Sequence, residues 1–99
     1  MASTKEYRDY VLEQLSEVPD VTCRPMMGEY LLYSNGILFG GIYDDRLLVK
    51  IVSENQQYEM PEAIPYDGAK PMYLVGDIDD KITLKEIITK TTGGLINGK

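Results

Sequence analysis

An Asn-Gly pair at residues 35–36 constrains the fold of this chain more than any other feature. Both residue types tolerate positive φ angles, so such a pair between two β-prone segments is the strongest short signal for a two-residue hairpin turn. The flanking segments, 29–34 (EYLLYS) and 37–43 (ILFGGIY), are rich in the aromatic and branched side chains that favour strands. Two aspartates at 44–45 then turn the chain into 47–51 (LLVKI). The pattern therefore predicts an antiparallel meander of three or four strands.

A helix is predicted before the meander. The segment STKE at residues 3–6 has the spacing of a capping box, in which Ser3 caps the helix and Glu6 reaches back to it. Apolar side chains then recur at helical spacing until Pro19 ends the pattern. We therefore expect a helix over residues 4–18.

A second helix is predicted near the end of the chain, over residues 80–92. The acidic run at 77–80 (DIDD) suits a helix N-terminus, because carboxylates accept the free N–H groups and favour the positive end of the helix dipole. The run does not match a calcium-binding loop, because a lysine and an isoleucine follow it at positions where a calcium loop needs oxygen ligands. The glycine pair at 93–94 is typical of a helix end, so residues 95–99 are expected to form a flexible tail.

Shorter elements are predicted elsewhere. Residues 21–24 are β-prone, and Pro25 limits them to the edge or the end of a sheet. Prolines and a glycine between Val52 and the next strand exclude a long regular element there. Within that stretch, residues 54–60 fit a short helix, and residues 72–75 fit one more short strand.

Together these elements define an α+β fold, a two-layer domain with an antiparallel meander sheet and N- and C-terminal helices. The chain has 99 residues, of which 43% are hydrophobic, and this suits one domain with one modest core. We expect that domain to span residues 1–94. Since no apolar run approaches the length of a membrane helix and the first residues lack the apolar stretch of a signal peptide, we expect a cytoplasmic protein without membrane association.

The predicted meander is apolar on both of its faces. Alternate positions of 37–43 place apolar residues on each side, and 29–34 does the same. Two helices of modest length cover one face of such a sheet, so the second face needs a cover of its own. We expect a second copy of the chain, in a homodimer. The alternative is that residues 54–71 fold back over this face, with the covering groups Met60, Ile64, Tyr66 and Met72.

Composition excludes several classes of chemistry. The chain has no histidine, which removes histidine general bases, Ser-His-Asp and Cys-His systems, and imidazole metal sites. Its one cysteine, Cys23, excludes an internal disulfide and is expected to be buried and inert. We therefore expect no enzyme activity, no catalytic residue, no metal site and no cofactor. The net charge of −6 repels polyanions, so we do not expect direct nucleic-acid binding.

Several short motifs follow one another in a characteristic order. They are RPMMGEY at 24–30, the Asn-Gly turn, FGGI at 39–42, DDRLLVK at 44–50, and the pairs Pro-Tyr at 65–66 and Met-Tyr at 72–73. This order resembles the TfoX/Sxy N-terminal domain family, with Met27 in place of the usual aromatic residue of a Met-aromatic-Gly turn. The resemblance implies an α+β fold similar to that of secretion chaperones. It also implies a stand-alone N-terminal domain, since longer members add a C-terminal helical domain.

The resemblance also implies a function. TfoX/Sxy proteins are co-activators of gene expression in natural DNA uptake, so the leading hypothesis is a non-enzymatic regulatory or protein-interaction domain with a protein partner in transcription regulation. The alternative is a sensor domain that binds a small acidic ligand through Arg24, Arg46 and Lys50. The candidate interaction residues are Arg24, Met26, Met27, Gly28, Arg46 and Lys50.

Each candidate also has a purely structural interpretation. Arg46 can pair with an aspartate of the 44–45 turn, and Arg24 and Lys50 can pair with Glu29 or lie over apolar surface. The two methionines fit a soft contact surface or gaps in the core equally well.

Overall fold

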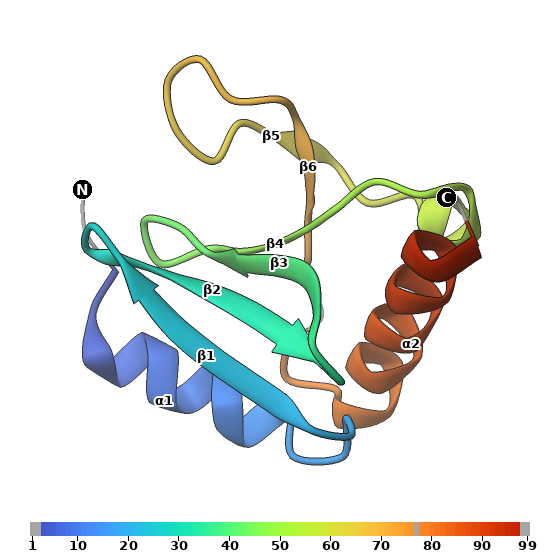
Figure 1. Cartoon of the computed structure of the whole chain (residues 1–99), viewed down its shortest axis with the longest axis horizontal. Helices are drawn as coiled ribbons and strands as arrows, with labels where there is room; N and C mark the ends of the chain where they lie inside the picture. The colour runs from blue at the N-terminus through green and yellow to red at the C-terminus, as the bar shows by residue number, and fades with distance from the viewer. Residues whose placement is uncertain (1–2, 77, 98–99) are drawn as a thin grey trace.

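The structure, a computed structural model, describes residues 3–76 and 78–97. Within them the chain forms a six-stranded antiparallel sheet, in the order β1-β2-β3-β4-β6-β5, with helices on one side (Figure 1). The elements in chain order are α1 (Lys5–Gln14), β1 (Val21–Met26), β2 (Glu29–Ser34), β3 (Ile37–Ile42), β4 (Leu47–Val49), the 3-10 helix η1 (Ser53–Tyr58), β5 (Glu62–Ala63), β6 (Met72–Leu74) and α2 (Lys81–Asn97). The predicted α+β class is confirmed.

The hairpin at the centre of the sheet is the one that the sequence predicts. Asn35 and Gly36 have φ angles of 52° and 79°, and they connect β2 and β3. A β-bulge shifts the register of this pair near Leu32, which lets Phe39 enter the core while its neighbour Leu38 faces the other side of the sheet. The prediction of the meander is therefore confirmed.

The edges of the sheet follow from the positions of its prolines and short strands. β1 is an edge strand, as Pro25 requires. At the other edge, β6 pairs with β4, and the two-residue strand β5 pairs with β6 outside it. The strand predicted near residues 72–75 is thus confirmed, whereas no sequence pattern predicts the two-residue strand β5.

Helix α1 begins one residue later than the capping box suggests. The cap is Thr4, whose hydroxyl accepts a 3.1 Å hydrogen bond from the Tyr7 N–H. Ser3 is not the cap, because its hydroxyl donates to Glu29 at 2.8 Å. The helix ends at Gln14, short of the predicted residue 18, and turns carry the chain on to β1.

Helix α2 continues past the glycine pair to Asn97, so the prediction that it ends at residues 93–94 is wrong. The reason is packing. A Cβ atom on Gly94 would lie 2.7 Å from Cγ2 of Val52, so glycine is needed there for close approach between α2 and the segment beside η1. Residues 95–97 of the predicted tail are helical, and residues 98–99 lie outside the described residues.

Both helices pack on the same face of the sheet. Their buried residues form one core with the inward side chains of the central strands (Figure 1). The segment between β5 and β6 extends on the side away from the helices (Figure 1). The fully covered members of the core include Val11, Leu15, Leu32, Phe39, Ile42, Leu47, Val49, Leu84 and Ile88.

Candidate functional site

The sheet face turned away from the helices, here called the open face, carries a second set of apolar side chains. Tyr33 of β2 is paired with Leu38 of β3, and residues paired directly across two strands share a face. On β1, Arg24 is paired with Leu31, which places both on the same side. Deeper in the sheet, Leu48 is fully buried but lies outside the helix-covered core. The predicted two-sided apolar sheet is therefore present.

A loop of residues 64–71, here called the cover loop, extends over part of the open face. Tyr66 of this loop packs against Tyr43 with the ring centroids 6.1 Å apart. The ring of Tyr43 in turn lies over Gly41, where a Cβ atom would come within 2.8 Å of it. Arg46 fixes the base of the loop, because it donates hydrogen bonds to the carbonyl oxygens of Ile64 (3.2 Å) and Tyr43 (3.1 Å).

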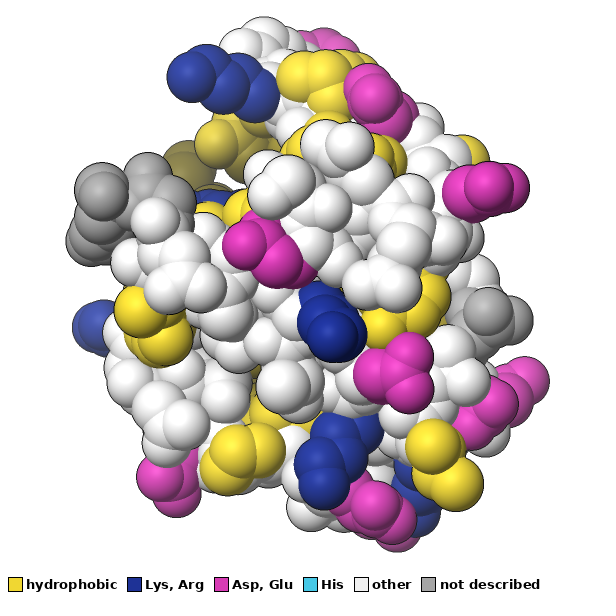
Figure 2. Space-filling view, turned by 90° about the vertical axis from the view of Figure 1, so that its right-hand side faces the viewer, with side chains coloured by type: hydrophobic (Ala, Val, Ile, Leu, Met, Phe, Trp, Pro, Cys, Tyr) yellow, Lys and Arg dark blue, Asp and Glu magenta, His cyan; other side chains and the backbone are white. Residues whose placement is uncertain are grey.

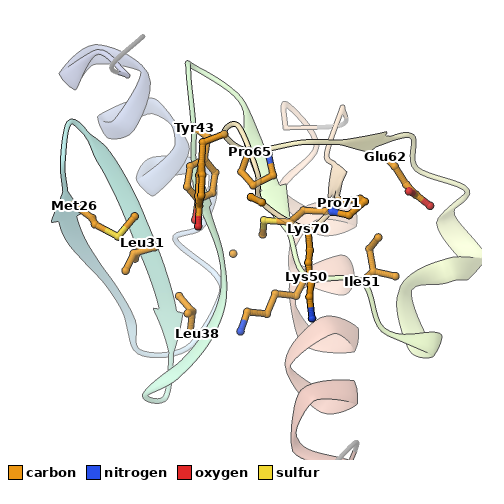
Figure 3. Close-up of a pocket in the computed structure, with 14 residues that line it drawn as sticks. Met26, Leu31, Leu38, Tyr43, Lys50, Ile51, Glu62, Pro65, Lys70 and Pro71 are labelled. Atoms are coloured by element: carbon orange, nitrogen blue, oxygen red, sulfur yellow. The ribbon is translucent and has the colours of Figure 1, made fainter.

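The cover loop leaves a groove of about 810 Å³ between itself and the sheet. Its walls are mostly apolar, and they come from β1, β2 and β3 on one side and from the cover loop on the other (Figure 3). Apolar lining residues include Met26, Leu31, Leu38, Ile51, Pro65 and Met72. A groove of this size and character is typical of sites that enclose a small molecule or a short peptide segment.

Two lysines bring positive charge into this apolar groove. Lys50 follows β4 and Lys70 belongs to the cover loop, and both side chains extend into the space between sheet and loop (Figure 3). Within residues 3–76 and 78–97, the ion pair that forms is Arg8 with Asp9, so neither lysine is paired with a carboxylate. Glu62 also lines the groove, but it lies at a different end (Figure 3).

Tyr43 adds a neutral polar group to the groove. Burial, with smaller contributions from the nearby Tyr66, Glu29 and Tyr33, raises the pKa of the Tyr43 hydroxyl above its ordinary value. The hydroxyl is therefore protonated at neutral pH and available as a hydrogen-bond donor.

The structure brings only some of the candidate residues together. Met26 and Lys50 line the groove, and Arg24 lies exposed on β1 at the sheet edge. Met27 and Gly28 form the β1–β2 turn, where the Met27 side chain is 98% exposed. Of the two methionines, one is therefore in the groove and the other is on the surface, and neither belongs to the helix-covered core.

Arg46 is a structural residue. It bonds to carbonyl oxygens of its own turn and of the cover loop, so the predicted pairing with an aspartate at 44–45 is wrong. Asp45 instead accepts a 2.8 Å hydrogen bond from the Thr4 N–H at the start of α1. Glu29 likewise accepts from Ser3 and from the Asp44 N–H, which leaves it outside any pair with Arg24 or Lys50.

Sequence reasoning missed Lys70. This residue lies in the proline-rich stretch between β5 and β6, where no periodicity predicts which side chains face the sheet. One sequence-based expectation does point to this segment. Tyr66 and Met72 are predicted to cover the second face of the sheet, and both line the groove. Met60, also expected there, packs instead against the helix-covered core.

Two other candidate chemistries have structural explanations. Asp80 accepts hydrogen bonds from the N–H groups of Ile82 (3.1 Å) and Thr83 (3.2 Å), so its role as a helix cap is confirmed, while Asp77 lies outside the described residues. Cys23 is half-buried, and burial raises the pKa of its thiol, which disfavours the reactive thiolate. Among the residues described, no group of His, Cys, Asp and Glu side chains is arranged to hold a metal ion.

Comparison with known proteins identifies the family. The TfoX N-terminal domain family matches residues 13–88, about three quarters of the chain. This chain belongs to the TfoX N-terminal domain family. The matched range runs from α1 into α2 and includes the hairpin, the cover loop and both lysines of the groove. The predicted resemblance is thus confirmed.

One relative is similar over nearly the whole chain. It is a protein of Spirochaeta aurantia described as "Uncharacterized 12.7 kDa protein in trpE 5'region". The two are 28% identical over 98 residues, which cover 97% of this chain and 85% of the relative.

In the part of the chain that the structure describes, no helix is long and apolar enough to span a membrane.

Proposed function

We propose that this TfoX N-terminal domain is a non-enzymatic, cytoplasmic regulator of gene expression that acts through protein contacts, as the TfoX/Sxy co-regulators of natural DNA uptake do. Family membership supports the regulatory role. The open face supports the contact role, because it displays apolar side chains that the domain's own core does not use.

The observation that carries this proposal is the β1–β2 part of the open face, which the cover loop leaves incompletely covered. There, Met26, Leu31 and Tyr33 are only half-buried, and Met27 projects from the adjoining turn with 98% of its side chain exposed. Contiguous exposed apolar groups on a small domain mark an interaction site, and methionine adapts its shape to a partner at little cost. A protein surface of complementary apolar character fits this area.

The first partner that we propose is a second copy of the chain. A two-fold dimer that joins the β1–β2 areas of two open faces would bury the half-exposed Leu31 and Met26 together with Tyr33. Light scattering at about 100 μM, well above the micromolar dissociation constants of ordinary specific contacts, should then give twice the 11.2 kDa mass of one chain. A mass of one chain at that concentration would refute the dimer.

A matched pair of variants tests whether the dimer uses this face. Tyr33→Asp should give a folded monomer, because a carboxylate would be buried without a partner at the contact. Ile82→Glu, at an exposed position on α2, should leave the dimer intact. Circular dichroism of both variants checks that the domain remains folded.

The regulatory role is tested in cells of the source organism. Deletion of the gene should change a defined set of transcripts, and wild-type protein should restore them. The variant Met27→Asp should fail to restore them although it is folded, because Met27 makes little contact with its own chain. Ile82→Glu should restore them fully. An unchanged set of transcripts on deletion would argue against the proposal.

We further propose that the domain does not itself read nucleic acid. On the face that carries α2, basic and acidic side chains are interspersed, so that side lacks the continuous basic surface of a phosphate-binding protein (Figure 2). The net charge is −6, which limits the counterion release that drives such binding. Fluorescence anisotropy with duplex DNA at physiological salt should show no selective binding below the micromolar range.

A further inference from the structure

We propose that the groove beneath the cover loop binds a small amphipathic carboxylate, an aliphatic or aromatic acid whose apolar body lies on the open face and whose carboxylate lies between the ammonium groups of Lys50 and Lys70. The groove shares Met26 and Leu31 with the proposed contact area on β1 and β2, but its charged groups, Lys50 and Lys70, lie outside that area, and the inference does not rest on the regulatory function.

The shape and lining of the groove determine the apolar part of the ligand. At about 810 Å³ it falls within the range of small-molecule sites, and aliphatic side chains and prolines form most of its walls. The floor is the rigid hairpin of β2 and β3, represented by Leu31 and Leu38, and the roof is the cover loop at Pro65 (Figure 3). An alkyl chain or an aryl ring placed between these surfaces would be removed from water on both sides.

The two lysines determine the polar part. In a chain with 16 acidic and 10 basic residues, Lys50 and Lys70 face an apolar space without a carboxylate partner among the described residues. Lys50 is half-buried, and a cation beside apolar surface gains more from an anion than a cation in water does, because the local dielectric constant is lower; Lys70 is exposed and adds a second positive charge at the same groove. The charge of the site therefore selects a negative ligand.

The position of Lys50 is fixed by the fold. Its N–H donates to the Phe39 carbonyl oxygen at 2.9 Å, and its own carbonyl oxygen accepts a 2.9 Å hydrogen bond from the fully buried Asn55. Asn55 also donates to Thr91 of α2 at 2.9 Å, so the backbone of Lys50 is held by the core. Lys70 comes from the cover loop, and an anion between the two would connect loop and sheet.

The donor set favours a carboxylate over a phosphate. Phosphate sites typically use arginine forks or a helix N-terminus, whereas the described lining of this groove offers two lysines and the Tyr43 hydroxyl. Arg46, the nearest arginine to the cover loop, already donates to two carbonyl oxygens. One negative charge on a ligand with a large apolar body matches these groups.

A fluorescence titration with the purified full chain tests the inference. The probe is 11-(dansylamino)undecanoic acid, whose emission rises when it enters an apolar site, with competition by decanoate and by its neutral counterpart decanol. We expect decanoate to displace the probe at least about tenfold better than decanol, since the carboxylate gains a charge-assisted hydrogen bond that the alcohol lacks. Equal competition by the two compounds would overturn the proposal, as would an absence of probe binding up to about 1 mM.

Charge-removing variants locate the carboxylate. Lys50→Met and Lys70→Met keep the length and apolar stem of the side chain, and each should weaken probe binding about tenfold, again from the loss of one charge-assisted hydrogen bond. The matched control is Lys85→Met, at an exposed position of α2, which should change the affinity by less than about twofold. Unchanged affinity in both groove variants would overturn the assignment of the lysines.

A groove-filling variant and a thermal melt complete the test. Leu38→Phe adds bulk to the floor and should abolish binding while the unfolding temperature changes little, because Leu38 contributes to the open face rather than to the core. Retained binding in this variant would place the probe elsewhere and overturn the site. Light scattering on the same samples reports the dimer separately, so failure of one proposal is distinguishable from failure of the other.

Discussion

The two faces of the sheet use the same strands and similar residues, yet they are covered in different ways. Toward the helices, Leu32 and Phe39 are fully buried by side chains of α1 and α2. Toward the open face, their chain neighbours Leu31 and Leu38 are half-exposed, and the cover loop stands off them across a groove. A helix presents a continuous apolar stripe at contact distance, whereas a proline-rich loop touches the sheet at a few points. One face therefore supplies stability and the other leaves room for binding.

The largest expected effect compares two adjacent leucines of β2. Leu32→Ala removes a fully buried side chain and leaves a cavity, so it should lower the free energy of unfolding by about 2–5 kcal/mol. Leu31→Ala removes the same atoms from the half-exposed open face and should cost about 1 kcal/mol or less. Urea unfolding of both variants, at a protein concentration low enough to keep the chain monomeric, measures the difference. Equal losses would show that the cover loop covers the open face as tightly as the helices cover the core.

The next comparison concerns the two glycines within α2. Gly94→Ala should destabilise the domain by about 1–3 kcal/mol, because the added methyl group would overlap the side chain of Val52. Gly93→Ala has no atom within 4 Å of the new methyl group and should instead stabilise the helix by about 0.5–1 kcal/mol. Thermal unfolding of the two variants should show a lower unfolding temperature for Gly94→Ala and a higher one for Gly93→Ala. Stabilisation by both changes would contradict the close packing of α2 on the η1 segment.

A smaller effect is expected where the cover loop is attached. Arg46→Met removes the hydrogen bonds to Ile64 and Tyr43 and should cost about 1 kcal/mol of stability. Its effect on the mobility of the cover loop should be larger than its effect on global stability. The loop loses its hydrogen bond to Arg46 and keeps the contact of Tyr66 with Tyr43. Limited proteolysis should therefore cut residues 64–71 several-fold faster in Arg46→Met than in the control Arg24→Met. Equal cleavage rates would mean that the aromatic contact alone holds the loop.

The helix-covered face is the part that could be predicted from the sequence. Hairpin chemistry at residues 35–36 and regular apolar spacing determine its strands and helices, and these signals are local. The groove depends on contacts between distant segments, such as Arg46 with Ile64, which no local pattern encodes. For the same reason the sequence pattern predicts a helix end at Gly94. In the structure Gly94 lies within α2, and it is glycine because Val52, distant in the sequence, packs against it.

The smallest expected effect is a pH dependence at the start of α2, one of the two helices on the helix-covered face of the sheet. Hydrogen bonds from the Thr83 hydroxyl, then from the N–H groups of Thr83 and Ile82, lower the pKa of Asp80 below its ordinary value of 3.8. Because the folded-state pKa is depressed, the stabilisation by Asp80 is fully present above 3.8 and is lost as the pH falls through the lower folded value.

A pH series of urea unfolding measures this contribution. The difference in stability between the wild type and Asp80→Ala should be constant from about pH 7 to about pH 5 and should narrow below the ordinary carboxyl pKa. The control Asp67→Ala removes an exposed carboxylate of the cover loop that takes no part in a helix cap, so its difference should stay near zero throughout. A difference for Asp80→Ala that persists unchanged at about pH 2.5 would show that the charge of Asp80 does not stabilise α2, and would assign its capping effect to the neutral carboxyl group.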